Sequence, residues 1–345
     1  MRDYSPGMNE HPEIWQPLEG LPDGAEDWGN PQCRVLERQW LEARSKTKAG
    51  DPADRFIEAW LAERNRAFAV ETGQIEGLYT LKRGVTEQLV AEGFAGVVGA
   101  HTLENLADRV IAGLLKDQTA ACEMLWQDVA ERRPLTASML KSWHALLTRH
   151  QETVTGLNII DGRIRKVRVP FVRKGVWKIA SNNPRRPDGV VHQYCPPEHV
   201  EAEMDRFFVI YNEEVAPRPY PVEVEAAWLH HRFVRTHPFQ DGNGRVSRLL
   251  MAYAYVRRNL PSPIVTAEEK PAYIDLLEAA DSGDLRVLVD GIAVLALRQL
   301  HGAQRIAQRA LSGKLNRPTG NGGRRVGDDY LPPCNGEPDL EELAR

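Results

Sequence analysis

Cysteine is scarce in this chain, and long apolar runs are absent from it. Its 345 residues include four cysteines, which lie far apart without a Cys-x-x-Cys pair: Cys33, Cys122, Cys195 and Cys334. A disulfide scaffold or a structural zinc site is therefore not expected, and the expected location is a reducing cytoplasm. No apolar stretch approaches the ~18 to 20 residues that span a bilayer, so no membrane-spanning helix is expected. The first residues, MRDYSPGMNEHPEIWQPLEG, lack the apolar segment of a secretory signal.

Charge of one sign is also lacking. The 44 basic and 48 acidic residues give a formal net charge of -4, so the chain as a whole carries no electrostatic signature of a nucleic-acid-binding protein. The remaining composition, 42% hydrophobic and 27% charged, is that of a folded globular protein. The length allows about two domains, or one larger domain with appendages.

The two ends of the chain have few apolar residues. Residues up to about Arg34 are rich in proline, glycine and acidic side chains, which indicates an irregular, partly ordered arm. From Ser312 onward, glycine and proline dominate, and such a segment cannot bury enough surface to offset its chain entropy. We therefore expect a disordered tail over 312–345.

Most of the sequence between these ends has helical periodicity, which predicts a mainly α fold. The predicted helices are Arg55–Phe68, Ala100–Leu115, Leu135–Leu147, Pro221–Arg235, Val246–Arg258, Pro271–Ala280 and Leu285–Leu311. The exception is Gly156–Pro197, where short alternating runs predict strands at Arg165–Val169 and Val190–Tyr194. The turn-rich SNNPRRPDG between them indicates a β-hairpin with a long loop.

The segment with the clearest chemistry is a loop between two predicted helices, Thr236–Arg248. Gly242 and Gly244 allow the backbone to turn tightly and approach a ligand. The free amides at the start of the following helix form an anion site, aided by the helix dipole. Arg245 and Arg248 are three positions apart and project from one side of its first turn, an arrangement that suits a polyphosphate.

Two further side chains of this loop suggest catalysis on that polyphosphate. Asp241 supplies the hard oxygen ligand that Mg²⁺ prefers when it bridges phosphates. His237 is the group whose pKa lies nearest neutrality, which makes it the natural general base. A lone histidine before proline is usually a surface or capping residue, and a single Gly-x-Gly is weak evidence. Their combination within twelve positions favours a functional site.

The stretch HPFQDGNGRVSR resembles the HPFx(D/E)GNGRxxR signature of Fic-domain proteins, as do the flanking AAWLHHRFVRT and RLLMAYAYVRR. The segment GVWKIASNNPRRPDGVVHQYCPPEHV resembles their flap. The resemblance extends roughly over 55–311. It implies a Fic-type helical bundle with a small β-hairpin flap beside the active-site loop. The implied division is an arm over 1–50, a helical region over 51–120, a Fic core over 121–311 and the tail.

The resemblance also implies a protein adenylyltransferase, which moves AMP from ATP to a Ser, Thr or Tyr hydroxyl of a target protein. His237 would deprotonate the hydroxyl, and Asp241 would hold Mg²⁺. Gly242, Asn243 and Gly244 would form the anion hole, while Arg245 and Arg248 would hold the β- and γ-phosphates. The related Doc proteins, which phosphorylate, depart from the GNGR sequence that this chain keeps. The expected flap residues, which would align the target, are Val176, Trp177, Lys178, His192 and Tyr194.

A second motif, TGQIEG at Thr72–Gly77, resembles the (S/T)xxxE(G/N) inhibitory motif of Fic proteins. By that precedent, Glu76 would pair with Arg248 and displace the γ-phosphate. The same pattern could mark an ordinary helix end with Gly77 as its cap.

Two alternative functions remain open on the sequence. One is a de-adenylylating phosphodiesterase that uses Glu76, Asp241 and Mg²⁺. The other is an idle nucleotide-binding module, which the intact motif disfavours. The expected partners are ATP and an unidentified target protein, possibly the chain itself. Nucleic acid is not expected as a partner, because no winged-helix domain follows Leu311. A membrane is not expected either, because long apolar runs are absent. A homodimer is possible.

Overall fold

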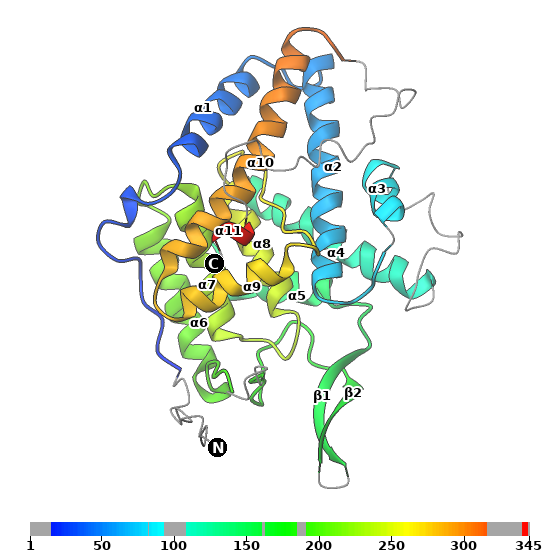
Figure 1. Ribbon diagram of the computed structural model, residues 1–345, viewed down its shortest axis with the longest axis vertical. Coiled ribbons are helices and arrows are strands. Elements are labelled where there is room, and N and C mark those ends of the chain that lie inside the picture. The colour runs from blue at the N-terminus through cyan, green and yellow to red at the C-terminus, as the bar shows by residue number, and fades with distance from the viewer. Residues whose placement is uncertain are drawn as a thin grey trace, which may run out of the picture.

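The computed structural model describes residues 15–81, 83–92, 108–160, 163–184, 191–315 and 340–343, and these are mainly helical (Figure 1). The helices are α1 (Pro31–Ser45), α2 (Pro52–Ile75), α3 (Arg83–Glu92), α4 (Asp108–Ala130), α5 (Ala137–Leu147), α6 (Val200–Val209), α7 (Val222–Thr236), α8 (Asn243–Val256), α9 (Lys270–Asp281), α10 (Leu285–Leu311) and α11 (Leu340–Leu343). Two strands, β1 (Thr153–Ile160) and β2 (Arg163–Pro170), form the one sheet of the described chain. The mainly α fold with a small hairpin is confirmed.

Helix α8 lies at the centre of the main core. Almost every residue from Asn243 to Tyr255 is buried, including Val246, Leu250 and Met251, which are fully inaccessible to solvent. A helix that is apolar around most of its circumference has to be covered on all sides. Helices α7, α5, α4 and α2 provide that cover. The start of α8 is therefore held in place by the core. The loop that precedes it is anchored at this end.

The predicted helices are present, with shifted ends. The predicted Arg55–Phe68 is part of α2, which begins earlier because the Asp51 carboxylate accepts a hydrogen bond from the Asp54 amide and Pro52 occupies the first turn. The predicted Ala100–Leu115 overlaps α4 only from Asp108, and residues 100–107 lie outside the described chain. None of the described helices is long and apolar enough to cross a membrane.

Helix α1 corrects the interpretation of the N-terminal segment as an irregular arm. The Asn30 side chain accepts a hydrogen bond from the Gln32 amide, and Pro31 is the first helical residue. Four residues at helical spacing are buried against the rest of the fold, where α1 packs along α10: Cys33, Leu36, Trp40 and Ala43. The signal for this helix, an Asn-Pro start followed by apolar residues three or four positions apart, is present in the sequence.

The hairpin differs from the predicted one in its pairing. Arg165–Val169 lies in β2 as predicted, but its partner is β1, with Thr153 opposite Pro170 and Ile160 opposite Arg163. The predicted partner strand at Val190–Tyr194 is wrong, since residues 192–196 are irregular and 185–190 lie outside the described chain. Asp161-Gly162, the sequence between the strands, is a strong signal for a two-residue hairpin connection. Such a short connection closes at lower entropic cost than a long loop.

Part of the predicted disordered tail is ordered. Helix α11 packs against α9 and α10, and its Leu340 is 2% exposed. Leu340 also lies near Gly291, where an added Cβ atom would be 3.5 Å from its side chain. Buried Leu340 and partly buried Leu343 thus hold residues 340–343 to the core, while residues 316–339 lie outside the described chain.

Candidate active site

Two residues with left-handed backbone conformation bracket the loop between α7 and α8. His237 caps the C-terminus of α7 with φ 48° and ψ 55°, and its amide donates to the Phe233 carbonyl. Gly242 precedes α8 with φ 80°. Glycine adopts this conformation at no steric cost, whereas a histidine there is strained and depends on its surroundings. The strain coincides with the side chain that the sequence identifies as the general base.

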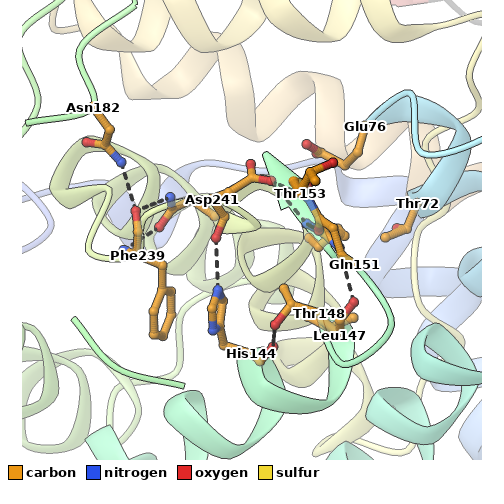
Figure 2. Close-up of polar contacts among 12 residues, drawn as sticks. Thr72, Glu76, His144, Leu147, Thr148, Gln151, Thr153, Asn182, Phe239 and Asp241 are labelled. Carbon is orange, nitrogen blue, oxygen red and sulfur yellow. Dashed lines mark hydrogen bonds and ion pairs between the residues drawn. The ribbon is translucent and has the colours of Figure 1, made fainter. Parts of the chain in front are cut away.

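The Asn243 side chain clamps the loop. Its Oδ1 accepts from the Phe239 amide and its Nδ2 donates to the Phe239 carbonyl, each at 2.9 Å. Asn182 donates to the same carbonyl at 2.8 Å (Figure 2). The Phe239 ring is fully buried and stacks on His144 with the ring centres 3.8 Å apart. The Asn243 side chain thus braces the loop. If Asn243 contributes to an anion hole, its backbone amide is the group that does so.

His144 of α5 fixes the other end of the loop. Its Nδ1 accepts from the Gly175 amide at 2.8 Å, so the proton is on Nε2, which donates to the Asp241 carbonyl at 2.9 Å (Figure 2). Burial lowers the pKa of His144 to about 3, which keeps the ring neutral and preserves this tautomer. No local sequence pattern marks His144, because it lies 97 positions from Asp241.

Gln151, also not identified from the sequence, links Asp241 to Arg245. Its Nε2 donates to Asp241 Oδ2 at 2.6 Å, and its Oε1 accepts from an Arg245 guanidinium nitrogen at 2.6 Å. Arg245 is fully buried and also donates to the Leu147 carbonyl at 3.0 Å. Both terminal nitrogens of Arg245 therefore have protein acceptors. Arg245 therefore helps to hold the loop in place, and its role at the nucleotide phosphates stays a prediction.

Arg248, one turn further along α8, faces the end of α2. Its guanidinium is 2.5 Å from Glu76 Oε1, its Nε donates to the Thr72 hydroxyl at 3.2 Å, and a terminal nitrogen is 3.3 Å from the Thr72 carbonyl. Burial alone would raise the pKa of the Glu76 carboxyl, but the charges of Arg248 and Arg245 outweigh it and hold that pKa below its usual value. Glu76 is therefore an anion paired with Arg248.

The end of α2 at Thr72–Gly77 is a capped helix terminus that also places Glu76 beside Arg248. Gly77 has φ 66°, its amide donates to Gln74, and the Leu78 amide donates to Gly73, which together form a Schellman cap. Glu76, the last residue before this cap, lies close to the catalytic loop. A Cβ atom added at Gly244 would be 2.3 Å from Glu76 Oε1. Glycine at 244 thus leaves space that the Glu76 carboxylate occupies.

Residues 134–255, which include the loop and all of α8 but its last residue, match the family model described as Fic/DOC family. Over these residues the chain is similar to a Fic domain. The chain is 40% identical over 97 residues to Protein adenylyltransferase Fic of Culex quinquefasciatus and 40% identical over 90 residues to that of Drosophila persimilis. These matches cover 28% and 26% of this chain, but the chain spans only 19% and 18% of those relatives.

The likeness in fold extends beyond the Fic domain. A Fic-domain signaling protein of Bacteroides thetaiotaomicron superposes with a TM-score of 0.61 at 22% identity, over 80% of this chain and 97% of that one. Fic-1 of C. elegans, residues 134–508, superposes with a TM-score of 0.54 at 21% identity, over 81% of this chain and 70% of that one. Helices outside 134–255 therefore belong to a fold that other Fic-domain proteins share.

The described parts of the segment predicted as the flap, on either side of residues 185–190, lie against the loop and are mostly irregular. The Lys178 amide donates to the Pro238 carbonyl at 2.7 Å, and the Trp177 ring is 4.8 Å from that of Phe239. Tyr194 stacks on His237 with the ring centres 3.8 Å apart. His192 lies edge-on to Tyr194, with its Nε2 3.8 Å from Asp281. Val176 is exposed, as is the neighbouring Ile179 at 71%.

The His237 side chain has a defined tautomer in this setting. Its Nδ1 lies 3.2 Å from the Val234 carbonyl, which can only accept, so Nδ1 carries the proton and Nε2 has a free lone pair. Burial, with the nearby charge of Lys178, lowers its pKa to about 3. The ring is therefore neutral near physiological pH with the Nε2 lone pair available, and its pKa lies well below the near-neutral value expected from the sequence.

We predict that the Fic fold loses stability as pH falls from about 6.5 toward 3. Burial lowers the pKa of His144 and His237 to about 3, and also lowers the pKa of His230 and His231. All four are neutral when folded but take up protons near pH 6.5 when unfolded, so acid favours unfolding. The urea midpoint should therefore be lower at pH 5 than at pH 7.5.

Glu37 makes the opposite contribution, because burial raises its pKa to about 7. Its protonated form favours the fold as pH falls from 7 toward 4.5. Glu37→Gln should therefore make the decrease in the urea midpoint steeper. An equal midpoint at pH 5 and pH 7.5 in this variant would show that the histidines are not held neutral.

Proposed function

We propose that this chain is a protein adenylyltransferase, which transfers AMP from ATP to a side-chain hydroxyl of a protein. The observation that carries the proposal is the neutral His237 ring with Nε2 free, held at the loop before the N-terminus of α8. The printed name of the curated relatives, Protein adenylyltransferase Fic, supports the same reaction.

In this reaction the target hydroxyl oxygen attacks the α-phosphorus of ATP. His237 Nε2 takes the hydroxyl proton as the new O–P bond forms and the bond to pyrophosphate breaks. The backbone amides of the first turn of α8, at Asn243 and Gly244, point out of the helix N-terminus and would bind phosphate oxygens. The braces from Asn243, His144 and Gln151 keep this loop in one geometry, which preorganises the site.

The donor set at Asp241 fits Mg²⁺. No group of three or more His, Cys, Asp or Glu side chains that could hold a metal occurs in the described part of the chain, but Mg²⁺ usually binds one or two carboxylates together with substrate phosphates and water. The Asp241 side chain is 38% exposed, and Gln151 orients it through a single hydrogen bond. Bound there with ATP, Mg²⁺ would neutralise negative charge on the phosphates.

We predict that Asp241→Ala abolishes adenylylation and that high Mg²⁺ does not restore it, because the carboxylate fixes the position of the metal. Isothermal titration of Mg²⁺ into the ATP-bound protein would test the assignment without relying on activity, and this variant should show the weaker binding. Asp275→Ala, on α9, is the matched control for loss of a carboxylate. Wild-type activity in excess EDTA would contradict a metal-dependent reaction.

We further propose that Glu76 inhibits the enzyme. Arg248 would otherwise be available to a nucleotide phosphate, but Glu76 and Thr72 already occupy its donors. Contacts elsewhere hold the end of α2 in this position. Lys270 Nζ donates to the Ile75 carbonyl at 2.7 Å, and the Ala267 amide donates to the Glu71 carboxylate at 2.9 Å. Release of Arg248 would then require a movement or replacement of Glu76.

The substrate surface that we propose is the flap segment beside His237. The exposed apolar side chains of Val172, Val176 and Ile179 lie in a segment anchored to the loop by Lys178. A target protein, which includes a second copy of this chain, could pack on them and present its hydroxyl to His237. Because the three described cysteines are free thiols, we infer that the enzyme works in a reducing compartment such as the cytoplasm.

Incubation with ATP labelled in the α- or the γ-phosphate tests the proposed reaction. Adenylylation transfers the α label to protein and leaves the γ label in pyrophosphate, whereas phosphorylation does the reverse. We expect only the α label on protein, and mass spectrometry should locate AMP on a hydroxyl. Transfer of the γ label would replace this proposal with a kinase activity.

A further inference from the structure

A small cavity lies between α2 and α10, two helices that pack side by side (Figure 1). Its volume is about 100 Å³, and none of its lining residues belongs to the Thr236–Arg248 loop. Four of them are arginines and none is acidic: Trp60, Arg64, Arg298, Gln299, Gly302, Arg305, Ile306 and Arg309. The helices approach closely beside it, since a Cβ atom added at Gly302 would be 3.1 Å from the Trp60 ring.

Arg64 is a buried cation whose donors are only partly used. It is 8% exposed, and one terminal nitrogen donates to Glu63 at 3.0 Å. Its Nε–H has no hydrogen-bond partner in the described part of the chain. A buried donor without an acceptor is costly and uncommon in folded proteins. Because Arg64 lines the cavity, this unused donor indicates an acceptor that the protein itself does not supply.

The cavity also has more positive charge than the nearby carboxylates neutralise. Arg298 pairs with Glu269, and Arg64 pairs with Glu63. Arg305 makes no ion pair with any described residue, although it lies at the same cavity. A second, smaller hollow shares Arg64, Arg298 and Gln299 with the first and extends to Thr266. An anion placed here would meet guanidinium groups from both helices.

We propose that this arginine-lined cavity binds a phosphate group, either as inorganic phosphate or as the end of a phosphomonoester. Guanidinium groups bind phosphate oxygens in pairs, and arginines from two helices suit a tetrahedral dianion better than a planar carboxylate. A cavity of about 100 Å³ has room for a phosphate group. The rest of a larger ligand would extend into solvent.

The bound phosphate would also stabilise the position of Glu76 beside Arg248. The effect of this on activity rests on the proposed adenylylation. A ligand that contacts Arg64 of α2 and Arg298 of α10 links the two helices, and α2 ends at Glu76. Arg298 is further connected through Glu269 to the neighbouring Lys270, which donates to the Ile75 carbonyl. Phosphate binding should therefore favour the state in which Glu76 pairs with Arg248, and so slow adenylylation.

Calorimetric titration with inorganic phosphate at constant ionic strength tests the site, whatever the activity of the protein. We expect Arg64→Met and Arg305→Gln each to weaken binding by roughly tenfold or more, since each removes charge-assisted hydrogen bonds. Arg305 is only half-buried, so its variant should fold even if Arg64→Met does not. Arg38→Gln, at an exposed position on α1, should bind as the wild type does. Equal affinity in wild type and Arg305→Gln would overturn the proposal.

The rate of adenylylation at increasing phosphate concentration tests the consequence for Glu76. We expect phosphate to slow the wild type and to leave Glu76→Gly unaffected, because the variant has no carboxylate to hold in place. Equal slowing of both would indicate competition with ATP at the α8 N-terminus, which would overturn the link to α2. Absence of adenylylation in both proteins would contradict the proposed function, while the calorimetric result would still decide whether the cavity binds phosphate.

Discussion

His237→Ala is expected to lower the rate of adenylylation by ~10² to 10⁴, the usual worth of a positioned acid–base group. The imidazole is held in one tautomer by the Val234 carbonyl and in one plane by Tyr194, with Nε2 free. In the proposed mechanism the imidazole acts on the target hydroxyl and not on the phosphates, so ATP affinity should change little. The measurement is the initial rate of α-label transfer, made in the Glu76→Gly background so that inhibition does not hide the loss.

The matched control is His301→Gln, which removes a histidine of α10 far along the chain from the loop. This variant should keep the rate of its parent. His237→Ala also removes a ring that stacks on Tyr194, so a melting temperature and an ATP titration should accompany the rate. A His237→Ala protein that is folded, binds ATP and keeps near-parental label transfer would remove His237 from the mechanism.

The candidate loop could be located from the sequence because its residues are contiguous. HPFQDGNGRVSR places His237, Asp241 and the start of α8 within twelve positions, so they lie close together in any fold of the chain. His144 and Gln151, which brace Asp241, lie 97 and 90 positions away. Contacts at such separations depend on how α5 packs against α8, and no short pattern encodes them.

The two motif arginines show the limit of spacing arguments. Arg245 and Arg248 leave α8 on the same side, as their separation of three predicts. Their long side chains then reach different partners, with Arg245 bound to Gln151 and Leu147, and Arg248 bound to Glu76 and Thr72. Helical spacing fixes the direction of the Cβ atom, but the acceptors around each side chain decide where its charged end lies.

The errors in secondary structure have a different cause. The predicted hairpin was assigned from β-branched residues at 190–194, but β2 pairs with the strand directly before it across Asp161-Gly162. Helix α1 was missed because proline and glycine around Pro31 suggested an irregular segment, although proline is well placed in the first turn of a helix. In both cases the local sequence contains a signal for the observed structure. The tertiary contacts that decide between competing local signals cannot be read from the sequence.

Glu76→Gly is expected to raise adenylylation by tenfold or more relative to wild type. The variant removes the carboxylate that lies 2.5 Å from Arg248 and frees the guanidinium to bind a nucleotide phosphate. It also opens the space beside Gly244 that Glu76 Oε1 now fills. The fold should tolerate the change, because Glu76 is the C-cap of α2 and glycine costs only ~1 kcal/mol even inside a helix. Initial rates of α-label transfer, on cell extract and on the protein itself, provide the measurement.

The double variant Glu76→Gly with Arg248→Ala should lose this gain, because the freed guanidinium is the means of activation. Glu58→Gly is the matched control, since it weakens α2 with the same substitution at a position paired with Arg44 and away from the loop. If that control were equally activated, loosening of α2 would explain the effect and release of Arg248 would not. If Glu76→Gly were no faster than wild type on any target, including itself, Thr72–Gly77 would be an ordinary Schellman-capped helix end. The Glu76–Arg248 pair would then be a structural contact.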